Sequence, residues 1–195
     1  MNFFLLKITI SIVMYYMIRI FYKNEKSLYI AALVSSGLFV CMYLIDYISL
    51  LKYEEISVIS NLHLISVGLS ILFLFIAYNE IIILEIKVRN LKKGELTERQ
   101  PFPVERNYKI LNKLLGISLL FLSFVFISGL ANTSIVDANI VFKALFTLIA
   151  WLIYVITFVG IKFFNFPIKY ATRSLFVAML AVIAAYYMNS YLIEL

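Results

Sequence analysis

The chain has 195 residues, of which 64% are hydrophobic and 14% are charged, and its mean hydropathy is +0.98. Soluble domains are roughly half apolar and about a quarter charged, so this composition excludes a soluble globular domain. The formal net charge of +6 would suit a nucleic-acid partner, but the basic residues lie at the ends of apolar runs, which argues against that class.

Six long apolar runs predict an all-α protein, a polytopic transmembrane helical bundle that forms a single domain over residues 1–195. A helix needs roughly 20 apolar residues to cross a hydrocarbon core about 30 Å thick. Backbone groups in lipid must bond within the segment, so each run is expected to be helical. The predicted spans cover about 3–21, 28–50, 57–84, 110–131, 138–161 and 171–192.

Lysine and arginine are concentrated in alternate gaps between these runs. Fourteen of the seventeen lie within residues 19–26, 87–113 and 162–173, and the exceptions are Lys7, Lys52 and Lys143. Cytoplasmic loops collect positive charge, so these three gaps are predicted to lie inside. Both the N-terminus and the C-terminus are then outside, and the longest inside connection is a cytoplasmic loop over 87–109.

Turn-forming residues mark that cytoplasmic loop. Lys92 and Lys93 before Gly94 predict the end of the third helix, because lysines suit the negative end of a helix and glycine suits its exit. Pro101 and Pro103 disfavour helix in the middle of the loop. The loop is too short to be a domain and is interpreted as a solvated connector.

His63, the only histidine, lies in the first turns of the third run. Ser66, Ser70 and Ala77 follow at i+3, i+7 and i+14, so the four residues share one helix stripe. One interpretation is a packing face, in which small residues let a neighbouring helix approach. The other is an axial imidazole ligand to haem at the outer membrane surface. A single histidine does not decide between them.

Other features argue against an enzyme. Cys41 is the only cysteine and is predicted to be buried within the second span, which excludes an internal disulfide and a CxxC or CxxCH motif. No residues have metal-ligand spacing, and no nucleophile–His–Asp set is present. Ala150, Trp151 and Tyr154 are interpreted as packing residues of the fifth span.

From the third run onward, a series of short motifs follows a set order and spacing: Leu62-His63, Ser66, Ser70, Ala77, Leu91-Lys92-Lys93, Pro101, Pro103, Glu105-Arg106, Leu115-Gly116, Ser128-Gly129, Lys143, Ala150-Trp151, Tyr154, Gly160 and Ala185-Tyr186. This series resembles the membrane haem-handling proteins of the cytochrome c assembly superfamily, of the CcsA/HemX type, and within it the eight-helix YpjD-like branch. Before His63 the resemblance extends to hydropathy only. The chain would correspond to the last six of the eight helices, which agrees with an outside N-terminus.

The resemblance implies a multi-pass protein of the bacterial inner (cytoplasmic) membrane that handles haem without being an enzyme. It implies that His63 binds haem iron, that Ser66 and Ser70 let helices close around the macrocycle, and that Lys143 or the outer loops meet the propionates. Haem-binding members usually supply a second histidine where this chain has Phe142. Bis-histidine ligation is therefore excluded within this chain.

Two other functions stay open. One is a structural or assembly subunit that has no cofactor and binds other membrane proteins, for which Phe142 in place of a ligand is the distinguishing feature. The other is a subunit of a small-solute transporter, such as the six-helix substrate-binding subunit of a vitamin importer. That class needs Gly- or Pro-interrupted helices, whereas the prolines here are all predicted to lie in inside loops. In every case the lipid bilayer is a partner and nucleic acid is not.

Overall fold

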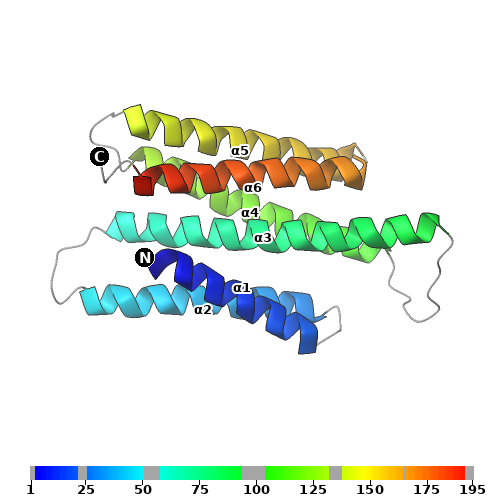
Figure 1. Cartoon of the computed structure of the whole chain (residues 1–195), viewed down its shortest axis with the longest axis horizontal. Coiled ribbons are helices and arrows are strands. Elements are labelled where there is room, and N and C mark those ends of the chain that lie inside the picture. Colours follow the sequence, from blue (N-terminus) through cyan, green and yellow to red (C-terminus); the bar gives the residue numbers. More distant parts are fainter. Residues whose placement is uncertain are drawn as a thin grey trace. The chain divides into compact units, whose positions relative to one another are not determined.

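The computed structural model describes residues 3–21, 26–50, 58–93, 104–131, 138–164 and 166–191. Within these ranges the elements are helices, which confirms the all-α class for the described residues. They are α1 (Phe3–Phe21), α2 (Lys26–Leu50), α3 (Val58–Lys92), α4 (Val104–Ala131), α5 (Ala138–Phe163) and α6 (Ile168–Tyr191), shown in Figure 1.

Five helices contain a stretch that is long and apolar enough to cross a membrane. These stretches are Leu28–Ile45, Leu62–Lys92, Tyr108–Gly129, Ala144–Phe163 and Ile168–Ala185. Only a structure that satisfies its own backbone groups is stable in lipid, and a helix does so within each segment. The protein is therefore membrane-embedded and multi-pass. α1 is also apolar and has 19 residues, equivalent to about 28 Å of helix.

The helices extend further than the predicted spans at the 87–109 connection. α3 has 35 residues, equivalent to about 52 Å, which exceeds a hydrocarbon core of about 30 Å. It continues past position 84 to Lys92, where the Lys93 N–H donates to the carbonyls of Arg89 and Asn90. α4 begins at Val104 rather than near 110. Gly94, Pro101 and Pro103 lie outside the described residues.

The chain divides into two compact units, Met1–Leu72 and Phe73–Leu195, and the division falls inside α3. In the first unit α1 packs on α2. The buried face of α1 carries Ile8, Ser11 and Tyr15, which are three and four residues apart, as helical periodicity requires. Early residues of α1 meet late residues of α2, so the two helices are antiparallel.

A cluster of aromatic rings holds the first unit together. Phe39 of α2 is fully buried, and its ring centroid lies 6.4 Å from that of Phe4 and 5.1 Å from that of Tyr43. The Lys7 ammonium lies 4.1 Å from the centroid of the Tyr43 ring, a cation–π contact. The Phe39 ring also covers Gly68 of α3 so closely that a Cβ at Gly68 would overlap it.

In the second unit, α4, α5 and α6 present buried faces with the same helical spacing of i, i+4, i+7 and i+11. α5 packs on both α4 and α6, and Figure 1 shows α5 and α6 joined by a short corner. The buried residues with this spacing are Leu111, Leu115, Ser118 and Leu122 on α4; Ala150, Tyr154, Thr157 and Ile161 on α5; and Ala171, Leu175, Ala178 and Val182 on α6. Alanines on the buried face of α6 let the α6 backbone approach the α5 backbone closely.

The corner between α5 and α6 is organised around Gly160 and Pro167. The Phe166 N–H donates to the Gly160 carbonyl at 3.0 Å, and Phe166 folds back against the space that a Gly160 side chain would fill. The Pro167 carbonyl accepts from the N–H groups of Tyr170 and Ala171, which starts α6. Pro167 thus lies in a connection, as predicted.

Cys41 is exposed on α2, so the prediction that it is buried was wrong. Apolar runs identify a membrane helix but not which of its faces meets lipid and which meets protein. Gly37, four residues earlier on α2, likewise has nothing within 4 Å of where its Cβ would be. This side of α2 is therefore free of contacts within the described residues.

Candidate functional site

His63 lies in the second turn of α3 and is half-buried. The leucines on either side, Leu62 and Leu64, are exposed. The imidazole is therefore partly covered and partly exposed. A side chain so placed can contact a ligand without the helix having to open.

The serines of the same stripe are more deeply buried. Ser66 is 7% exposed and Ser70 is 1% exposed, and Ala77 further along is fully buried. The Ser66 hydroxyl donates to the Leu62 carbonyl at 2.7 Å. The Ser70 hydroxyl has no hydrogen-bond partner among the described residues. The stripe therefore includes a packing face, with the histidine at its less buried end.

The other predicted site residues belong to α5. Phe142 is 53% exposed, and the Lys143 side chain lies outside the described residues. His63, Ser66 and Ser70 are thus brought together on one helix. Phe142 and Lys143 are on a different helix in the second unit.

Among the residues that the structure describes, no three histidine, cysteine, aspartate or glutamate side chains gather where they would hold a metal ion. Haem iron does not need such a cluster, because the macrocycle supplies the equatorial ligands and the protein supplies one or two axial ones. A half-buried imidazole between two exposed leucines fits a single axial ligand. The Ser66 hydroxyl already donates to a carbonyl of its own helix, so Ser66 is better suited to helix packing than to contact with the cofactor.

Polar pairs in the second unit were not predicted from the sequence. The Trp151 Nε1–H donates to the Ser123 hydroxyl of α4 at 2.8 Å. The Thr157 and Ser174 hydroxyls share a hydrogen bond at 2.7 Å that joins α5 to α6. The packing roles expected for Trp151 and Tyr154 are confirmed. The partners, Ser123 and Ser174, could have been suspected from the sequence only because each is an isolated hydroxyl residue within an otherwise apolar run.

Tyr154 is the most deeply buried polar side chain of α5. It is fully buried, and Ser118 of α4 lies beside its hydroxyl. The contact does not meet hydrogen-bond geometry, and the hydroxyl has no other partner in the described part of the chain. Burying an unpaired hydroxyl costs free energy, so Tyr154 contributes to packing through its ring.

No family model, no curated protein and no solved structure matches this chain. The interpretation of the α3 face therefore rests on its own residues.

Proposed function

We propose that the protein is a non-enzymatic, haem-handling membrane protein of the cytochrome c assembly type, in which His63 binds haem iron near the outer membrane face. One observation supports this most: the only histidine of the chain is half-buried in the second turn of α3, between two exposed leucines. Haem binding needs an imidazole that packing holds in place and that is partly exposed, and the half-burial of His63 supports the proposal for this reason.

In this proposal the residues of α3 bind and orient the group. When bound, haem supplies a redox-active iron and an apolar macrocycle. His63 would supply a nitrogen ligand to the iron, and Leu62 and Leu64 would supply apolar contact area. Ser66 and Ser70 keep the rest of the stripe narrow, so that a neighbouring helix can pack close below the histidine.

The remaining residues of the proposed haem site lie in the first turns of α5. Lys143 is proposed to pair with a propionate carboxylate, as the family resemblance implies. Phe142 has no atom that could ligate iron, so this chain would hold the group through His63.

An absorption spectrum tests this function. Protein made in a haem-replete host and purified in detergent should show a Soret band near one haem per chain, and His63→Ala should lose at least about 90% of it, because removing the protein's axial ligand removes its main contact with the iron. Leu120→Ala is the matched control, because it removes apolar bulk from an exposed position of α4 and keeps the imidazole. A folded wild type without a Soret band would exclude haem handling. A His63→Ala protein with full haem content would exclude the ligand assignment alone.

We further propose six spans, α1 included, with both termini outside in a bacterial inner membrane. The basic residues support this orientation, since they gather at the α3–α4 connection and at the α5–α6 corner. In a Cys41→Ala background, a cysteine at Lys93 should react with an impermeant maleimide only after the membrane is opened. A cysteine at Asp137 should react in intact cells. The reverse pattern would overturn the orientation.

A structural or assembly subunit without a cofactor is the second candidate. The burial of Ser66, Ser70 and Ala77 favours it, because a helix packing face accounts for the whole stripe except His63. A colourless, folded protein that purifies in a stoichiometric complex with a second membrane protein would support this role. His63→Ala should then leave that complex intact.

A further inference from the structure

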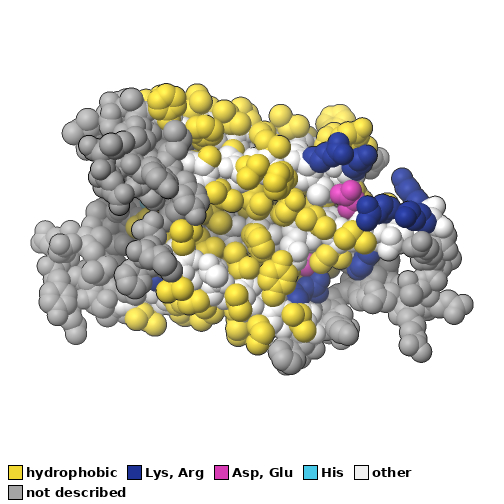
Figure 2. All heavy atoms as spheres, viewed as in Figure 1, with side chains coloured by type: hydrophobic (Ala, Val, Ile, Leu, Met, Phe, Trp, Pro, Cys, Tyr) yellow, Lys and Arg dark blue, Asp and Glu magenta, His cyan; other side chains and the backbone are white. Residues whose placement is uncertain are grey.

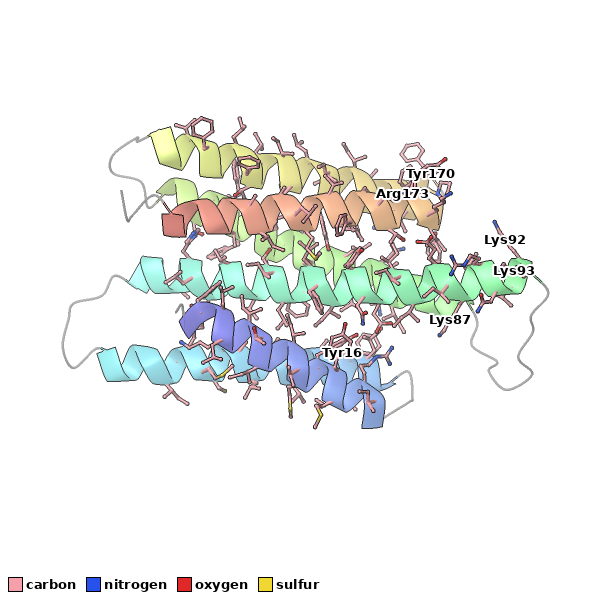
Figure 3. The ribbon with its side chains drawn as sticks, in the orientation of Figure 1. Tyr16, Lys87, Lys92, Lys93, Tyr170 and Arg173 are labelled. Carbon is pink, nitrogen blue, oxygen red and sulfur yellow. The ribbon has the colours of Figure 1, made fainter. Side chains whose placement is uncertain are left out.

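The corner that joins α5 to α6 exposes basic and aromatic side chains side by side. We define the α5–α6 corner as the described residues 162–164 and 166–173. Its exposed residues are Lys162, Phe163, Phe164, Lys169, Tyr170 and Arg173, and Phe163 and Phe164 expose 67% and 76% of their surface. Figure 2 shows Lys and Arg side chains next to hydrophobic ones at this end of α5 and α6, and Figure 3 labels Tyr170 and Arg173 there.

Aromatic rings hold the Lys162 ammonium, one of the three positive charges of the corner, against the apolar surface of the helix. The Lys162 ammonium lies 5.1 Å from the centroid of the Phe163 ring and 5.6 Å from that of the Phe158 ring. Both distances are within the range of a cation–π contact. The lysine therefore lies along the helix rather than extending away from it, which places its charge near the boundary between apolar and polar surroundings.

No acidic side chain from either helix balances this charge. The sequence has no aspartate or glutamate between Asp137 and Glu194, and the first turn of α6 has no acidic residue. Lys169 and Arg173 lie in the first two turns of α6, where the helix dipole favours anions and disfavours cations. Within the described ranges of the second unit, the acidic residues are Glu80 and Glu85 of α3 and Glu105 of α4, and the last turns of α3 carry basic residues.

We propose that the α5–α6 corner binds the headgroup of an anionic phospholipid. Lys162, Lys169 and Arg173 contact its phosphate, and Phe163, Phe164 and Tyr170 lie among the adjacent glycerol and upper acyl groups. Aromatic residues gather at membrane interfaces, and basic clusters beside a span attract anionic lipids. A lipid phosphate also offsets the unfavourable position of two cations at the start of α6. This proposal does not depend on haem binding.

The same charges also fit a role in topology alone, so the test has to separate a local site from diffuse attraction. The corner variant carries Lys162→Gln, Lys169→Gln and Arg173→Gln. The control variant carries Arg89→Gln, Lys92→Gln and Lys93→Gln. These control residues are exposed at the end of α3, so the control removes the same charge at a different place in the second unit.

The measurement is lipid retention by native mass spectrometry of the full chain. Purified protein is titrated with phosphatidylglycerol or phosphatidylcholine that carry identical acyl chains. Each basic residue near an anionic surface is worth about a fivefold factor, so the wild type should prefer phosphatidylglycerol by at least about tenfold. The corner variant should lose most of this preference and the control variant should keep it. Lys169→Gln alone should lower the preference by about fivefold. Because Lys169 is exposed, this single variant should fold normally and tests the proposal even if the triple variant misfolds.

Three results would overturn the proposal. The first is a wild type without a preference for phosphatidylglycerol. The second is an equal loss in the corner and control variants, which would mean diffuse charge and no local site. The third is complete displacement of phosphatidylglycerol by inorganic phosphate, which would mean a site for free anions and not for a lipid.

Discussion

Replacing Gly68 by alanine should destabilise the first unit, because the new methyl group would occupy the same space as the Phe39 ring. Phe39 is fully buried between Phe4, Tyr43 and α3, so its ring cannot move aside without disturbing the aromatic cluster. Overpacking of this kind costs about 1–3 kcal/mol. Alanine gains up to about 1 kcal/mol over glycine in helix propensity, which offsets part of that cost. With the full propensity gain subtracted, a net destabilisation of about 0–2 kcal/mol is expected, which is about 1–3 kcal/mol more than for an alanine at an open glycine position.

Gly37→Ala is the matched control, since nothing lies within 4 Å of where its Cβ would be. That substitution should be neutral or stabilising by up to about 1 kcal/mol. Unfolding in mixed micelles with increasing SDS, followed by circular dichroism, measures both variants. Adding Phe39→Leu to Gly68→Ala should recover stability relative to the sum of the single changes, because the ring that clashes is shortened. If the two glycine variants behave alike, the described contact between α2 and α3 is wrong.

Two further predictions concern the polar pairs of the second unit. Thr157→Val removes the hydrogen bond to Ser174 and keeps the side-chain shape, so SDS unfolding should show a loss of about 0.5–1.5 kcal/mol. Thr9→Val, which removes a hydroxyl bonded only to its own helix, should change stability by less than about 0.5 kcal/mol, and an equal loss in both would contradict a role in joining α5 to α6. Ser123→Ala removes the acceptor of the Trp151 Nε1–H, so the emission of this single tryptophan should shift to the blue; an unchanged spectrum would contradict the contact.

The helices were well predicted from the sequence, because an apolar segment that crosses lipid has to pair its own backbone groups and therefore forms a helix. α1 has the predicted bounds, and the other helices contain most of their predicted spans. The end of α3 at Lys92 agrees with the helix end predicted from Lys92, Lys93 and Gly94. The start of α4 at Val104 was missed because hydropathy marks only the part of a helix inside the hydrocarbon. The amphipathic turns between Val104 and Lys109 are helical but too polar to be counted by that criterion.

The contacts between helices were much less predictable. The spacing of Ser66 and Ser70 correctly indicated a shared face, because helical periodicity alone places them there. Which residue covers Gly68 depends on the register between α2 and α3, and nothing local in the sequence fixes that register. The same holds for Trp151 and its acceptor, which are 28 residues apart. The haem role of His63 stays a prediction.

Many hydroxyl groups in the apolar runs donate to a carbonyl three or four residues earlier in their own helix. Ser11, Ser35, Ser66 and Ser128 all do so, at 2.7–3.1 Å. These hydroxyl groups are therefore hydrogen-bonded within their own helix when it leaves the translocon. Such a helix can enter the bilayer before the neighbouring helices have been inserted. Trp151 is different, because its partner is on another helix. Its indole is satisfied only when α4 and α5 meet, so its emission would report assembly as a step separate from insertion.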